Sequence, residues 1–149
     1  MELHRHISRR LHEEHEATLA LWSRLEASAA ANRLDAALLR SAAAALAEEL
    51  DRHFAFEEEE LFPRLAAAGE ADIGELLAEE HATIRAAGRE FIALAKGDAA
   101  DPRLRALGLE LAERLIAHVQ KEEMSLLPSL DDLLDEETDG ELISTYAAA

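Results

Sequence analysis

The sequence predicts an all-α protein folded as an up-down-up-down antiparallel four-helix bundle. Helix-forming residues such as Ala, Leu, Glu and Arg dominate, whereas only 3 Pro, 6 Gly and 6 aromatic residues occur among the 149. Each long stretch between helix breakers also carries one apolar stripe with a spacing of three or four residues. The breakers lie in short segments, and short turns place successive helices antiparallel.

Four helices are expected, at residues 3–30, 35–62, 72–96 and 102–126. The first ends before the segment 31–35, the second before Pro63 and the third before Gly97. Asp101 followed by Pro102 is typical of an N-cap with proline at the first helical position, so the fourth helix begins there.

The chain is expected to form a single domain because its length suits one hydrophobic core. Residues 1–130 are assigned to the bundle. After Pro128 the sequence becomes acidic and loses its apolar period. Residues 131–149 are therefore expected to be an acidic C-terminal tail or short helix, and the whole segment 129–149 to hold one short helix and a frayed end.

The composition excludes several classes of function. A net charge of −17 disfavours binding to nucleic acid, and the lack of cysteine excludes disulfides and thiolate metal sites. There is no run of 18 apolar residues and no apolar segment behind the basic N-terminus, so neither a membrane span nor a secretory signal is expected. We expect a cytoplasmic protein.

Histidine interrupts the apolar stripe of every predicted helix. These histidines are His15, His53, His81 and His118, and the second and fourth are followed four residues later by Glu57 and Glu122. The sequence around them repeats: HFAFEEEELFPRL at residues 53–65 resembles HVQKEEMSLLPSL at residues 118–130. The bundle is therefore predicted to consist of two related helical hairpins.

Arithmetic on the turns predicts that the four histidines lie in one layer. Residues equidistant from the turn of an antiparallel hairpin lie at one height. The midpoints between successive histidines are 34, 67 and 99–100, and each falls in a predicted turn. Glu57 and Glu122 follow their histidines by one helical turn, about 6 Å along the axis, so both carboxylates are expected beside the imidazoles.

Such a layer predicts a metal site, because buried charges without partners are very costly. Six nitrogen and oxygen donors are too many for one tetrahedral zinc and too rich in nitrogen for calcium or magnesium. They suit two first-row transition ions, each with two histidines and shared carboxylates. Iron is the leading candidate, with manganese or zinc as alternatives. An added oxo or hydroxo bridge would leave about one open position on each ion.

The order of these residues resembles the hemerythrin-like, or HHE cation-binding, family. A histidine on the first and third helices and an HxxxE motif on the second and fourth carry the resemblance, which covers about residues 8–130. It implies a non-haem di-iron centre that interacts with O2, NO or peroxide. Leu77 and Arg85 occupy the positions at which oxygen-carrying hemerythrins have a further histidine. The site therefore looks more like the four-histidine, two-glutamate version of the superfamily.

Other functions remain open on the sequence alone. The same centre could belong to a di-iron enzyme that reduces peroxide or oxygen, to an iron storage or donor protein, or to a bundle whose metals only hold the helices together. Because no nucleotide- or flavin-binding motif such as GxGxxG occurs, electrons would come from a redox partner protein.

His12 is the residue that could make the two halves of the site unequal. It precedes His15 by three positions, and its counterpart in the repeat is Ala78. We expect His12 to be a fifth histidine ligand or a hydrogen-bond partner of Glu57 or Glu122. Glu58 and Glu123 point away from the ligand face and are expected at the surface or in support of the ligands.

Overall fold

The computed structural model describes residues 2–149, which form helices and contain no strand. The helices are α1 (His6–Ala30), α2 (Ala36–Glu48), the π-helical η1 (Glu49–Phe54) and η2 (Glu57–Leu61), α3 (Phe62–Ala67), α4 (Ala71–Ala95), α5 (Pro102–Met124), α6 (Leu126–Leu133) and α7 (Glu136–Ala148). The segments from α2 to α3 follow one another without a loop and make one long helical segment. The predicted all-α class is confirmed.

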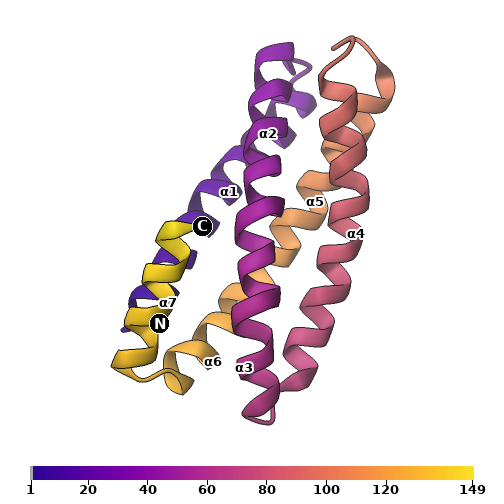
Figure 1. Ribbon diagram of the computed structural model, residues 1–149. Helices are drawn as coiled ribbons and strands as arrows, with labels where there is room; N and C mark the ends of the chain where they lie inside the picture. Colours follow the sequence, from indigo (N-terminus) through magenta and orange to yellow (C-terminus); the bar gives the residue numbers. More distant parts are fainter. Residues whose placement is uncertain (1) are drawn as a thin grey trace.

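The bundle consists of α1, the α2–α3 segment, α4 and α5, which alternate in direction (Figure 1). Helix α5 packs against both α1 and α4, and α4 packs against α2 and α3. Contacts between α1 and α2 complete the ring. These neighbours are those expected for two antiparallel hairpins joined by short turns.

Side-chain caps fix the starts of two of these helices. Asp35 accepts a hydrogen bond from the backbone N–H of Leu38 at 2.8 Å, which caps α2. Asp101 accepts one from the N–H of Arg103 at 2.9 Å, and Pro102 is the first residue of α5. The start predicted for the fourth helix is therefore confirmed.

The second and fourth helices end differently from the prediction. The second continues through Pro63 to Ala67, because Pro63 lies in the first turn of α3, where a missing N–H is tolerated. It ends at a turn in which Gly69 has a φ of 86°, a conformation that favours glycine. The fourth helix stops at Met124, and Ser125 separates it from α6.

The C-terminal segment is more ordered than the sequence indicates. The expected frayed end is wrong: α7 is a helix of 13 residues that packs on α1 and buries Leu142 and Tyr146. Buried Asp139 of α7 also accepts hydrogen bonds from the N–H groups of His6 and Ile7, at 2.8 and 2.9 Å. The C-terminal helix thus caps the N-terminus of α1.

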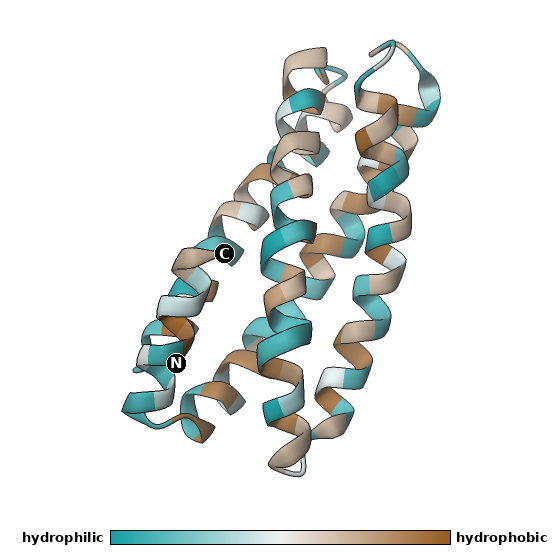
Figure 2. Cartoon of the chain, viewed as in Figure 1, coloured by the Kyte–Doolittle hydropathy of each residue, from teal (hydrophilic) through white to brown (hydrophobic). Residues whose placement is uncertain are grey.

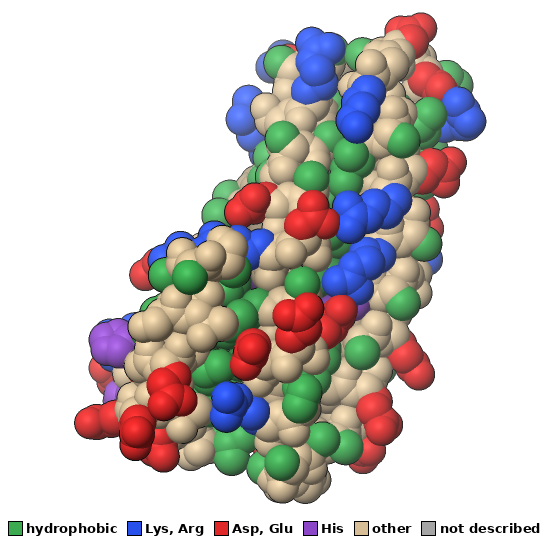
Figure 3. Space-filling model, in the orientation of Figure 1, with side chains coloured by type: hydrophobic (Ala, Val, Ile, Leu, Met, Phe, Trp, Pro, Cys, Tyr) green, Lys and Arg blue, Asp and Glu red, His purple; other side chains and the backbone are tan. Residues whose placement is uncertain are grey.

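Two hydrophobic clusters lie on either side of the predicted histidine layer. One contains Trp22, Leu46 and Phe91, and the other contains Leu11 and Leu77, among others. Hydrophobic residues recur between hydrophilic ones along each helix (Figure 2), and acidic and basic side chains are scattered over the face of the molecule seen in Figure 3. Within residues 2–149, no helix has the length and apolar character needed to cross a membrane.

Candidate metal centre

The six predicted ligands meet inside the bundle. His15, His53, His81, His118, Glu57 and Glu122 are each at most 2% exposed. The ring centroids of His15 and His53 lie 5.1 Å apart, and those of His81 and His118 lie 4.8 Å apart. The histidines therefore form the close layer that the turn arithmetic predicts.

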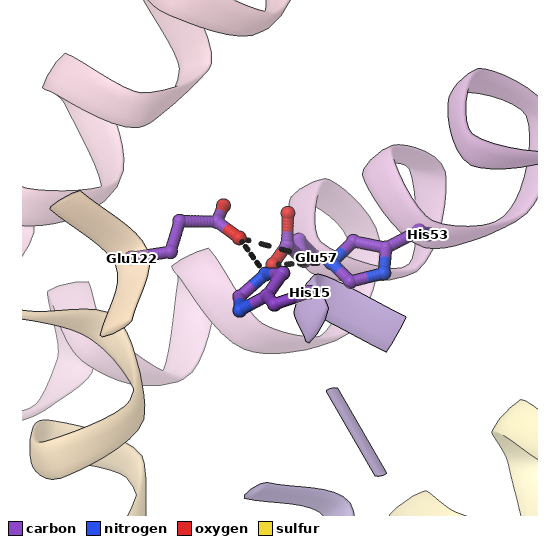
Figure 4. Close-up of side chains that lie close together, drawn as sticks. All are labelled: His15, His53, Glu57 and Glu122. Carbon is purple, nitrogen blue, oxygen red and sulfur yellow. Dashed lines mark hydrogen bonds and ion pairs between the residues drawn. The ribbon is translucent and has the colours of Figure 1, made fainter. Parts of the chain in front are cut away.

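One group of ligands comes from α1, the α2–α3 segment and α5. His15 Nε2 lies 2.7 Å from Glu122 Oε1, and His53 Nε2 lies 3.2 Å from Glu57 Oε2. Figure 4 shows both imidazoles and both carboxylates directed toward one another. Nitrogen and oxygen atoms of four side chains thus converge on one small volume.

A second group lies beside the first. His81 Nε2 is 3.2 Å from Glu57 Oε1, and His118 Nε2 is 3.0 Å from Glu122 Oε2. The two Nε2 atoms are only 3.1 Å apart. In each group the ligand atoms all lie within 4.8 Å of one another, and both groups include Glu57 and Glu122.

This donor set fits metal cations. Glu57 Oε1 and Glu122 Oε2 are buried and make no hydrogen bond within the described residues, although each lies within ion-pair distance of an imidazole Nε2. A buried carboxylate oxygen without a partner costs free energy, and a cation between the carboxylate and the imidazoles would remove that cost. Neutral imidazole and carboxylate are ligands that first-row transition metals accept.

The comparison with protein families agrees with this geometry. Residues 6–130 match the hemerythrin HHE cation binding domain. The chain belongs to the hemerythrin HHE family. No match was found among curated proteins or among solved structures. The family and the buried clusters together identify a cation-binding helical bundle.

Wide helical turns position two of the predicted ligands of this HHE domain. His53 lies in η1 and Glu57 begins η2, so both belong to π-helical stretches. A π turn rotates the following side chains relative to an α-helix, and such turns are frequent at functional sites. Pro63, which has no N–H to donate, follows η2 and favours the altered hydrogen-bond pattern there.

Each histidine of the candidate centre is also held from its outer side by a second carboxylate. His15 Nδ1 lies 2.7 Å from Glu123, and His53 Nδ1 lies 3.0 Å from Glu14. An outer carboxylate fixes the tautomer and orientation of a metal-binding imidazole and increases its basicity.

The other two histidines follow the same rule. His81 Nδ1 lies 2.7 Å from Glu58, and His118 Nδ1 lies 2.8 Å from Glu80. With all four Nδ1 atoms held outward, all four Nε2 atoms face the centre.

The outer carboxylates repeat with the same offset as the ligands. Glu14 and Glu80 immediately precede a histidine, 66 residues apart, while Glu58 and Glu123 are 65 residues apart. The sequence predicts Glu58 and Glu123 at the surface or in support of the ligands, and the structure shows the supporting role; Glu14 and Glu80 are not predicted. The signal was present in the repeated EEH motif at residues 13–15 and 79–81.

His12 lies outside both ligand groups. Its Nδ1 contacts Glu123, the carboxylate behind His15, and its side chain is 42% exposed. The structure therefore places His12 in contact with an outer carboxylate rather than with Glu57 or Glu122.

The metal-free centre carries paired charges. Burial lowers the pKa of His15, but hydrogen bonds to Glu122 and Glu123 outweigh it and raise the pKa to about 9. Burial opposes protonation of His81 in the same way, yet its pKa rises to about 10 because of Glu122 and Glu57. Burial raises the pKa of Glu122, but the surrounding imidazoles hold it well below its usual range. A metal cation would take the place of these protons.

Proposed function

We propose that this protein holds two iron ions, one in each ligand group, and uses them to interact with O2, NO or peroxide. The observation that carries the proposal is that two four-residue groups share both of their glutamates. Shared carboxylates suit two adjacent cations whose mutual repulsion they reduce. Manganese or zinc is the alternative cation.

The protein residues would bind and orient the ions. Two histidines would hold each ion, and Glu57 and Glu122, which belong to both groups, would be available to both ions. Four protein donors leave coordination positions free on an ion that accepts five or six ligands. When bound, such a pair supplies redox chemistry and open positions for a small molecule.

Apolar side chains keep bulk water from this centre. The ring of Phe54 stacks on His81 with centroids 3.8 Å apart, and the ring of Phe62 lies 5.5 Å from the same imidazole. Leu11, Leu61 and Leu77 are each at most 1% exposed. A small uncharged molecule enters such surroundings at less cost than a charged substrate.

Turnover of peroxide or oxygen by the same ions, and storage or donation of iron, are the alternatives. Reduction would need a second protein to supply electrons, and donation would need one to receive the iron. The cytoplasmic location predicted from the sequence is compatible with either partner.

The first test is the metal content per chain, measured with an absorption spectrum after anaerobic iron loading and again after exposure to air. We expect two irons per chain and new near-ultraviolet bands on oxidation. Glu57→Gln and Glu122→Gln should reduce the iron content, whereas Glu59→Gln, which changes an exposed neighbour, should not.

Three results would separate the alternatives. Peroxide consumption above that of the metal-free protein would favour the enzyme, and rapid loss of iron to a chelator would favour storage or donation. A single zinc ion, or no metal under any loading condition, would contradict the proposed di-iron centre. The assignment of the helical bundle would still hold.

A further inference from the structure

The C-terminal helix α7 lies outside the part of the chain that matches the family, which ends at residue 130. It nevertheless reaches the metal centre through one side chain. Tyr146 is 1% exposed, and its ring lies edge-on to His53 with centroids 6.5 Å apart. No counterpart of α7 follows the first hairpin, so its contact is made with one ligand group only.

Several contacts fix the position of Tyr146. The guanidinium of Arg52 lies 4.4 Å from the centre of the ring and donates a hydrogen bond of 2.9 Å to the backbone carbonyl of the same tyrosine. Phe56 packs against the ring with centroids 4.7 Å apart. The phenol therefore has little freedom to turn away from its partner.

That partner is Glu14, the outer carboxylate of His53. The Tyr146 hydroxyl donates to Glu14 Oε1, the same oxygen that lies 3.0 Å from His53 Nδ1. Arg10 donates to the other oxygen, Oε2, at 3.2 Å. Glu14 is thus held at both oxygens, and the oxygen that orients His53 is the one fixed by the phenol.

We propose that Tyr146 is a positioning residue that holds Glu14 against His53 and so tunes the ion bound by His15 and His53. The inference rests on the proposed dinuclear centre. It connects a helix outside the HHE domain with one half of that centre, so that the two ions differ in their support.

The other outer carboxylates have different supports. Lys121 contacts Glu80 behind His118, and Arg85 donates to Glu58 behind His81 at 2.8 Å. Two cations thus support the carboxylates of the second ligand group. In the first group, a phenol contributes beside Arg10 at Glu14, and an imidazole contacts Glu123.

The test is an anaerobic titration with cobalt(II), followed by absorption and by competition with a chelator. Tyr146→Phe keeps the ring and removes only the hydroxyl, and we expect it to weaken one of two binding steps by about 3- to 10-fold. This is less than the roughly 10- to 100-fold loss typical when an outer partner itself is removed. Lys121→Met is the matched control and should weaken the other step.

A double-mutant cycle separates this role from a general loss of stability. If Tyr146 acts through Glu14, then Tyr146→Phe should change neither step in a Glu14→Gln background. An equal loss in both backgrounds, or no loss in the natural background, would overturn the inference. If melting of the metal-free variant shows that Tyr146→Phe is unfolded, Arg52→Met, which frees the ring and keeps the phenol, replaces it with the same expected direction.

The number of cobalt ions bound distinguishes failure of the proposed function from failure of this inference. A natural chain that binds fewer than two cobalt ions would contradict the dinuclear centre, and the inference would fall with it. Two ions that bind normally but ignore Tyr146 would overturn the inference alone.

Discussion

At the scale of single residues, each imidazole of the candidate centre has an inner contact at Nε2 and an outer contact at Nδ1. Nε2 faces the buried carboxylates, and Nδ1 faces a partly exposed one. The histidines are therefore fixed before any ion binds, which reduces the ordering cost of binding. This arrangement makes the outer carboxylates as much a part of the site as the ligands.

Among these outer contacts, the contact of His12 is expected to have a small effect on iron binding. His12→Ala should weaken iron binding by a few fold without abolishing it, because His12 contacts Glu123 and not the ligand groups. Glu16→Ala, which removes only the exposed partner 3.3 Å from His12 Nε2, serves as the control. Unchanged iron affinity and absorption in His12→Ala would show that this imidazole is only a surface group.

As the pH rises, the free energy of unfolding of the metal-free protein should fall, whereas the affinity for metal should increase. Stability from protonated His15 and His81 is fully present below their unfolded pKa of about 6.5. It is lost as the pH rises through their folded values of about 9 and 10. The free energy of unfolding of the metal-free protein should therefore fall between pH 7 and pH 10.

Metal affinity should rise over the same range, because the cation displaces these protons. Urea unfolding in the presence of a chelator, and cobalt(II) titrations at several pH values, measure the two trends. Proton release on metal binding, followed with a pH indicator at pH 7, gives an independent check. An affinity that does not change with pH would contradict the protonation of these imidazoles in the metal-free protein.

At the scale of helices, the start of α1 depends on a residue far away in the sequence. Asp139→Ala removes both hydrogen bonds to the first N–H groups of α1 and should lower the free energy of unfolding by about 1–2 kcal/mol. Glu141→Ala, at an exposed position of the same helix, is the control and should have little effect. Chemical unfolding of the metal-free variants measures both, and equal stabilities would refute the capping role.

Both hairpins contain irregular helix close to their HxxxE motifs. The π-helical stretches lie only where the α2–α3 segment carries His53 and Glu57, among the helices described. The repeat has its own irregularity at the matching place, since α5 ends at Met124 shortly before Pro128. Proline after a ligand motif thus interrupts regular α-helix in both hairpins, although in different ways.

At the scale of the whole molecule, metal should control stability. Binding to the folded state alone stabilises a protein by about 2.7 kcal/mol for each site when free ligand is 100 times the Kd. Removing the metal with a chelator should therefore lower the melting temperature by several degrees, measured by circular dichroism. A variant lacking Glu57 and Glu122 should melt at the same temperature with and without metal. If metal still raised the melting temperature of that variant, the stabilising ion would bind at another site.

The helical bundle, the two related hairpins and the six residues that meet at the centre of the bundle could all be predicted from the sequence. This was possible because an apolar period, short turns and a 65- to 66-residue repeat are local or arithmetic signals. His15 and His118 could be placed at one height without any knowledge of their contacts.

The groups that hold the predicted ligands from outside, and the contacts of the C-terminal segment, became known only from the packing of the helices. Glu14 reaches His53 across the interface between α1 and η1, and a charged residue at a helix surface gives no sign in the sequence of the neighbour that it contacts. Asp139 and Tyr146 lie in a segment with little apolar period, and their burial depends on docking against α1. Such contacts between distant residues arise from packing geometry, which no local pattern encodes.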